Sequence, residues 1–202
     1  MRRLILALAI AFTAPALGAA APQRPAEFNP SDTADLDRVS AYLNAIHTMR
    51  GSFIQIGPQG QVDQGKFYIM KPGKMRFDYD APNPTLVISD GISIAVYNTK
   101  LNTANRYPLS STPLDLLLSN TVDLKRSMSV VSVEHQTGEL IVNARSTDRR
   151  TTGNITIVFS VPNLELRQWT IVDPQGLATT IDLRNVQQGV DLPAAAFQIM
   201  HH

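Results

Sequence analysis

GKFYIMKPGKMRFDYDAP, residues 65–82, is the stretch that decides the fold. Runs of alternating apolar and polar residues flank Pro72-Gly73, and proline followed by glycine is typical of a turn between strands. The pattern therefore predicts a β-hairpin. Because successive strand residues point to opposite faces of a sheet, one face of this hairpin carries large apolar side chains and a single cation. These residues are Phe67, Ile69, Lys71, Met75, Phe77 and Tyr79.

The two faces of the hairpin differ in character. Lys74, Arg76, Asp78 and Asp80 lie on the other face of the second strand, which we expect to face solvent. Two interpretations of the apolar face remain open. It packs on an ordinary core, as in most two-faced antiparallel sheets, or it lines a cavity for an apolar ligand. Residue spacing does not decide between them.

The rest of the chain has the pattern of an antiparallel sheet. Short alternating runs separated by turn residues predict eleven strands, and a sheet of that size is expected to curl. The predicted strands lie near residues 52–57, 62–71, 74–80, 84–89, 92–98, 102–107, 128–135, 139–145, 153–160, 165–172 and 177–185. We see no second domain.

Two helices are predicted beside the sheet. After the N-cap Ser31, apolar residues recur every three or four positions, which predicts an amphipathic helix that ends near Gly51. Thr112 as N-cap and Pro113 at the first helical position predict a short second helix. It contains Leu114, Leu116, Leu117 and Leu118, and the pattern extends it, after a break, through Val122 and Leu124. The two helices could plug the concave side of a curled sheet.

The N-terminus has the pattern of a secretory signal. Arg2-Arg3 precede an apolar run and then small residues around Ala16 to Ala21, and we expect cleavage after Ala20. The predicted parts are a signal peptide at 1–20, a loose segment at 21–30 and one domain at 31–202. The whole chain has 18 basic and 17 acidic residues. This balance offers no basic field for nucleic acid.

Catalytic and metal-binding motifs are missing from the sequence. It has no cysteine, no H-E-x-x-H pattern, no G-x-S-x-G elbow and no Gly-rich phosphate loop. We therefore predict neither an enzyme nor a metal or cofactor site, and we interpret His47 and His135 as satisfied or solvent-facing. Because a bacterial lipoprotein carries its lipid on a cysteine, we expect an exported, soluble protein, not a lipid-anchored one.

An ordered set of motifs runs from about Leu36 to Ile199. The chain has an N-terminal amphipathic helix, then Gly51-Ser52-Phe53-x-Gln55, Gly65-x-Phe67-x-Ile69-x-Lys71-Pro72, Arg76-Phe77-x-Tyr79-x-x-Pro82, Val87-Ile88-Ser89-Asp90-Gly91, Val96-Tyr97-Asn98, Thr112-Pro113-Leu114 and a terminal Phe197. This set resembles the LolA family of periplasmic outer-membrane lipoprotein carriers. The resemblance implies a mainly β fold with helices, an incomplete, strongly curved antiparallel β-barrel with a helical lid.

The resemblance also implies a function. A monomeric periplasmic carrier without a cofactor would take triacylated lipoproteins from an ATP-driven inner-membrane complex and deliver them to an outer-membrane receptor. We expect its lipid-binding cavity to be lined by Phe53, Phe67, Ile69, Met75, Phe77, Tyr79, Leu86, Ile88, Leu114, Leu117 and Leu118. Two alternatives stay open: a lipid- or glycolipid-binding transport or envelope-sensing protein of the same fold, and an enzyme on a similar scaffold.

Lys71 departs from the family pattern. The family has an arginine here, taken to hydrogen-bond the lid helices and to set the balance between closed and open forms. Lys71 follows Phe67 and Ile69 at two-residue spacing, so strand alternation places it on the apolar side. A charge is costly there unless it has a partner. An ammonium is a point donor without the planar fork of guanidinium. We expect Lys71 to act as a lid latch, and the alternative is a snorkelling lysine at a strand end.

Overall fold

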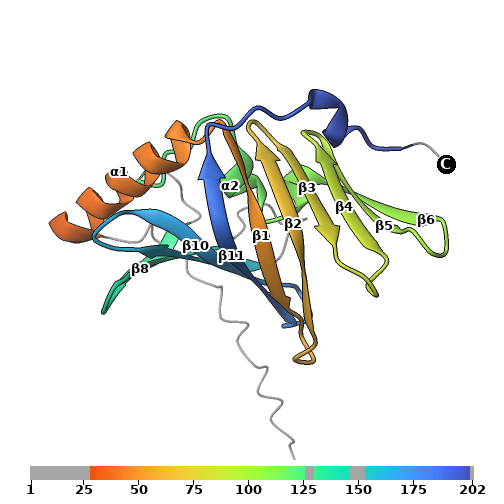
Figure 1. Ribbon diagram of the computed structural model, residues 1–202. Coiled ribbons are helices and arrows are strands. Elements are labelled where there is room, and N and C mark those ends of the chain that lie inside the picture. Colours follow the sequence, from red (N-terminus) through yellow and green to blue (C-terminus); the bar gives the residue numbers. More distant parts are fainter. Residues whose placement is uncertain (1–27, 126–129, 146–152, 201–202) are drawn as a thin grey trace, which may run out of the picture.

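The computed structural model describes residues 28–125, 130–145 and 153–200. The predicted signal peptide and most of the loose segment after it therefore lie outside the described residues. Eleven antiparallel strands form one curved, open sheet in the order β6-β5-β4-β3-β2-β1-β11-β10-β9-β8-β7 (Figure 1). Their bounds are β1 Thr48–Ile56, β2 Val62–Met70, β3 Lys74–Tyr79, β4 Thr85–Asp90, β5 Ser93–Asn98, β6 Thr103–Pro108, β7 Val130–Gln136, β8 Glu139–Arg145, β9 Asn154–Ser160, β10 Glu165–Val172 and β11 Ala178–Gln188. The predicted fold class is confirmed.

Helix α1, Pro30–Ala45, begins before the predicted N-cap Ser31. Its N-cap is Asn29, whose side-chain oxygen accepts a hydrogen bond from Asp32 N at 2.8 Å. Pro30 occupies the first turn, where a missing N–H costs nothing. The prediction of Ser31 as N-cap was therefore wrong.

The other end of α1 also differs from the prediction. The helix stops at Ala45, and β1 begins at Thr48, so the expected extension to Gly51 was wrong. Met49 pairs with Ile69 of β2 on one side and with Gln188 of β11 on the other. Strand pairing on both sides stabilises an extended backbone here, although the apolar spacing of Met49 also fits a helix.

The second predicted helix is reduced to one turn. Helix α2 spans Asp115–Leu118, and Thr112 ends the preceding 3-10 helix η1, Leu109–Ser111, instead of capping α2. Val122 and Leu124 are buried, but they lie in non-helical chain, so the predicted extension of the helix was wrong. Their backbone N–H groups donate to side chains of α1, which replaces helical hydrogen bonding.

The sheet has an inner and an outer face. The inner face packs against α1 and α2, and Phe67, Ile69, Met75 and Phe77 are buried there, as the hairpin pattern predicted. Phe77 lies at the centre of the aromatic contacts. Its ring centroid is 4.8 Å from that of Phe53, 5.9 Å from that of Phe67 and 6.1 Å from that of Trp169.

Part of the outer face of β3–β5 is covered by chain, which corrects in part the expectation of a solvent face: Lys74, Arg76 and Asp78 are half-buried, whereas Asp80 is exposed. Residues 189–200, here called the C-terminal segment, cross it and include the 3-10 helix η2, Ala194–Phe197 (Figure 1). Ile199 packs on a second cluster of buried side chains, and Arg76 Nη1 donates to Ala196 O at 3.1 Å. The cluster consists of Leu86, Ile88, Ala95 and Tyr97.

Candidate functional site

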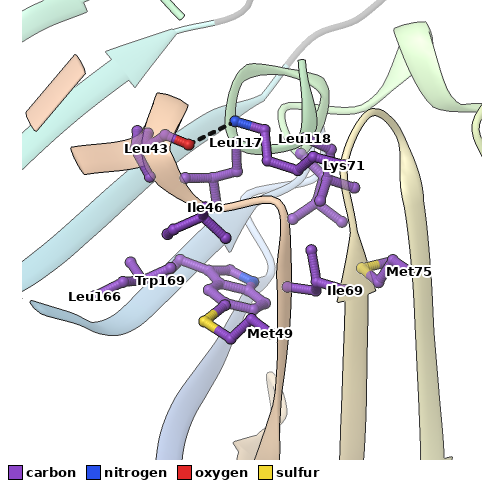
Figure 2. A pocket seen from close by; sticks show the side chains of 11 residues that line it. Leu43, Ile46, Met49, Ile69, Lys71, Met75, Leu117, Leu118, Leu166 and Trp169 are labelled. Atoms are coloured by element: carbon purple, nitrogen blue, oxygen red, sulfur yellow. Dashed lines mark hydrogen bonds between the residues drawn. The ribbon is translucent and has the colours of Figure 1, made fainter. Parts of the chain in front are cut away.

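A narrow apolar cavity lies between the helices and the inner face of the sheet (Figure 2). It is lined by Leu43, Ile46, Met49, Ile69, Lys71, Met75, Leu114, Leu117, Leu118, Leu166 and Trp169. The space open to water is only about 20 Å³, close to the room for a single water molecule. Side chains of α1 and α2 therefore fill the inner face, and a larger ligand has to displace them.

Most of the predicted site residues lie together on this inner face. Ile69, Lys71 and Met75 line the cavity from the hairpin, and Leu114, Leu117 and Leu118 line it from the region of α2. Phe53, Phe67, Phe77 and Tyr79 belong to the same apolar cluster beside the cavity. The hairpin face is thus part of the core and also borders the cavity.

Leu86 and Ile88 do not belong to this cavity, which corrects their prediction. Residues directly opposite each other in an antiparallel pair share a face. Ile88 pairs with Arg76 and Leu86 pairs with Asp78, so both point to the outer face. Val87, which pairs with Phe77, is the residue of β4 that packs on the inner cluster.

The prediction of the site missed residues from distant parts of the chain. Leu166 and Trp169 of β10 line the cavity because the strand order brings β10 around to face α2 and the hairpin. Trp169 is only 2% exposed. Leu166 and Trp169 are three residues apart, so regular alternation would place them on opposite faces. They share a face because the register of β10 against β9 shifts between Leu166 and Gln168, and no signal in the sequence marks that shift.

Lys71 joins the hairpin to the C-terminal end of α1. Its Nζ donates a hydrogen bond to Leu43 O at 2.8 Å (Figure 2), and its backbone N donates to His47 O at 2.8 Å. The last four carbonyls of a helix lack intrahelical partners and form the negative end of the helix dipole. The last turn of α1 contains no basic residue of its own. Lys71 therefore supplies both the donor and the charge, while burial lowers its pKa.

The same turn holds α2. Gly73 N donates to Leu118 O at 2.8 Å, and the buried Ser89 Oγ donates to Gly73 O at 2.7 Å. Gly73 has a φ of +74°, and a Cβ on it would lie 2.6 Å from the Cα of Gly91. Only glycine fits both constraints. Residues 71–73, here called the hairpin turn, thus contact both helices.

Helix α1 is also bound to the chain that follows α2. Asn44 Nδ2 donates to Val122 O at 2.9 Å, and Asn44 Oδ1 accepts from Val122 N at 2.8 Å. Ser40 Oγ accepts from Leu124 N at 3.0 Å. These bonds join α1, α2 and residues 119–125 into one unit, here called the lid.

The far end of the lid meets the edge of the sheet. His135 Nε2 of β7 lies 2.7 Å from Asp35 Oδ2 of α1, and Arg38 Nη1 donates to the other Asp35 oxygen at 2.8 Å. His135 is thus a satisfied surface histidine, as predicted. Among the described residues, no group of three or more histidine and carboxylate side chains is placed to hold a metal ion. No helix in this part of the chain has both the length and the apolar character needed to cross a membrane.

Comparison with known proteins points to one family. The model of the family described as outer membrane lipoprotein carrier protein LolA matches residues 44–200. An outer-membrane lipoprotein carrier protein of Bordetella avium is 27% identical over 171 residues, which cover 80% of each chain. A protein of the same name from Cupriavidus necator is 28% identical over 185 residues, which cover 84% of this chain and 85% of the relative.

Solved structures with a similar course of the chain were also found. A LolA superfamily protein of Nitrosomonas europaea has a TM-score of 0.43 at 9% identity, with 81% of this chain and 97% of that chain covered. A structure of MucB has a TM-score of 0.45 at 10% identity, with 84% and 63% covered.

Proposed function

The chain belongs to the LolA family of outer membrane lipoprotein carrier proteins, and from this premise we propose that it carries lipoproteins through the periplasm. The observation that supports this function is the apolar cavity closed by a lid of leucines. Acyl chains offer no hydrogen bonds, so their carrier needs apolar surface that can be uncovered. In this proposal the acyl chains of a triacylated cargo displace Leu117 and Leu118 and take their place against Trp169.

The lid also explains how such a cargo could be released. Burial of an acyl chain contributes about 0.8 kcal/mol per methylene, so one chain of roughly fifteen methylenes contributes about 12 kcal/mol gross. Several chains bound at that strength would not dissociate. Because the closed lid already buries the same inner face, the cost of displacing it offsets part of this gain.

The other parts of the proposal follow from the premise. The signal pattern at residues 1–20 supports export, with 31–202 acting as one carrier domain. An ATP-driven inner-membrane complex would load the carrier, and an outer-membrane receptor would accept the cargo. The protein itself would bind and release without catalysing a reaction.

Native mass spectrometry of the protein purified from its own periplasm tests the function. We expect a population of complexes whose extra mass is that of a triacylated protein. Met75→Glu, which places a charge in the cavity, should lose this population. Leu101→Glu, a matched change at a residue that is 67% exposed, should keep it. Free lipid or glycolipid alone would support the transport or sensing alternative, and protein that is always empty would contradict binding in the cavity.

A further inference from the structure

Strands β10 and β11 separate partway along their length. Their pairing runs only from Gln168 opposite Asp182 to Val172 opposite Ala178. In the described structure, residues 165–167 of β10 and residues 183–188 of β11 do not pair with each other as neighbouring strands. Figure 1 shows β11 continuing beside β1 while β10 sweeps away beneath α1. The sheet therefore has an internal opening with two strand edges facing it.

Irregularities on both strands produce this opening. The register of β10 against β9 shifts between Leu166 and Gln168. The register of β11 against β1 shifts between the partners of Arg50 and Ser52, where Asn185 has a φ of +52°. An extra residue in one strand bends it away from regular pairing. The divergence is thus built into the backbone.

The opening forms a groove with polar walls. Its volume is about 540 Å³, and Glu165, Arg167, Asn185 and Gln188 lie along it, all exposed. Strand edges present backbone N–H and C=O groups that pair readily with another extended chain. The groove therefore suits an extended polypeptide better than a purely apolar ligand.

One lid residue occupies part of the groove. The hydroxyl of Tyr42 in α1 accepts hydrogen bonds from Leu166 N and from Gln188 Nε2, both at 2.9 Å. Tyr42 thus takes the place that a neighbouring strand would have beside Leu166. Because Tyr42 belongs to the lid, displacement of α1 would free this edge of β10.

The groove and the apolar cavity lie next to each other. Leu166 lines both of them, with its backbone at the groove and its side chain at the cavity. A lipoprotein carries its acyl chains on a cysteine that is followed directly by polypeptide. We propose that the groove between β10 and β11 binds this polypeptide as an extended strand while the acyl chains fill the cavity. This inference rests on the proposed function and adds a second binding site for the same cargo.

Two synthetic probes separate the two sites. One is a triacylated cysteine amide, and the other is the same lipid followed by a short polar peptide. Two or three added backbone hydrogen bonds of ordinary strength should make the peptide-bearing probe bind about tenfold more tightly. Methylation of alternate peptide nitrogens should remove this gain, because it removes the donors. Affinities can be measured by competition for the full-length mature protein.

Matched variants of the protein complete the test. Arg167→Trp, which fills the groove at an exposed position, should abolish the gain without changing the affinity for the acyl cysteine amide. Lys100→Trp, at an exposed turn outside the groove, should retain it. Equal affinity for both probes, or a gain that survives methylation and Arg167→Trp, would overturn the groove proposal and leave the carrier function standing. If neither probe binds, the carrier function itself fails.

Discussion

The inner and outer faces of β3–β5 are both covered by chain from outside the sheet, but by different means. On the inner face, the leucines of the lid pack against Met75 and Trp169 around a cavity. On the outer face, the backbone of the C-terminal segment is held by side chains of the sheet. Arg106 Nη2 donates to Met200 O at 2.7 Å, and the hydroxyl of Tyr97 accepts from Met200 N at 2.8 Å.

This difference indicates which of the two covering segments, the lid or the C-terminal segment, a lipid can displace. Acyl chains make the same apolar contacts as leucine side chains, so they can substitute for the lid on the inner face. They cannot substitute for hydrogen bonds to a backbone, which hold the C-terminal segment in place. Near the cavity, the lid bonds to the sheet at a few points: at the hairpin turn through Lys71 and Gly73, and at β10 and β11 through the hydroxyl of Tyr42. We therefore infer that the lid moves and the C-terminal segment stays.

Truncation of a buried side chain on each face should have the largest effects. Phe77→Ala should lower the free energy of unfolding by about 3–5 kcal/mol, and Ile88→Ala by about 2–4 kcal/mol, because both leave cavities in the core. Urea denaturation measures both changes. In cargo binding they should differ, since only Phe77 lies on the inner face. Equal loss of cargo binding in folded samples of the two variants would break the distinction between the faces.

Tyr79 should make the inner face sensitive to alkaline pH. Burial, together with the negative charge of Asp63, raises the pKa of Tyr79 from 10.0 to about 12. The phenol is thus more easily ionised in the unfolded chain. Its contribution to stability should be complete below pH 10 and should be lost as the pH rises toward 12, by about 2–3 kcal/mol in total.

The difference between wild type and Tyr79→Phe isolates this titration. Urea denaturation at a series of alkaline pH values should show a steeper loss of stability for the wild-type protein. Parallel pH profiles of the two proteins would show that Tyr79 ionises as easily in the folded state as in the unfolded chain.

Loss of the Lys71 ammonium should affect the lid more than the fold. Lys71→Leu removes the hydrogen bond to Leu43 O, which should weaken the closed form by about 1–2 kcal/mol after allowance for its partial exposure. Loading or release of a fluorescent triacylated lipopeptide should change about tenfold. Lys66→Leu, at an exposed lysine of β2, is the control. Unaltered loading and release in Lys71→Leu would rule out the latch and leave a snorkelling lysine.

The smallest expected change is on the outer face. Tyr97→Phe removes the hydroxyl that bonds Met200, which should cost about 1 kcal/mol of stability. Cargo binding should not change. Thermal denaturation and a binding titration on the same sample check this pair of expectations, and weaker cargo binding would show that the two faces are coupled.

The hairpin could be predicted from the sequence because its signal is local. Pro72-Gly73 marks the turn, and alternation places Phe67 and Phe77 on the same face. Leu86 and Ile88 were misplaced because their face depends on the register of β4 against β3, and the loop between the two strands does not fix that register. An alternating pattern divides the side chains of a strand between two faces, but it does not show which segment of the chain packs on each face.

Other parts depend on contacts between distant segments. The end of α1 is set by the pairing of Met49 with β2 and β11, which competes with helical spacing. Leu166 and Trp169 reach the cavity only through the strand order. Strand alternation was enough to predict that Lys71 points to the apolar side. It could not predict the acceptor of the ammonium, which is a backbone carbonyl at the end of α1.

The most direct test of a movable lid is a pair of distance measurements by electron spin resonance. The chain has no cysteine, so spin labels can be placed at will. One sample carries Ala41→Cys on α1 and Lys66→Cys on β2, and the other carries Lys66→Cys and Ala195→Cys on the C-terminal segment; all three positions are exposed. Adding a triacylated lipoprotein should lengthen the first distance and leave the second unchanged. If cargo binds and the first distance stays the same, the lid does not open and the central claim is wrong.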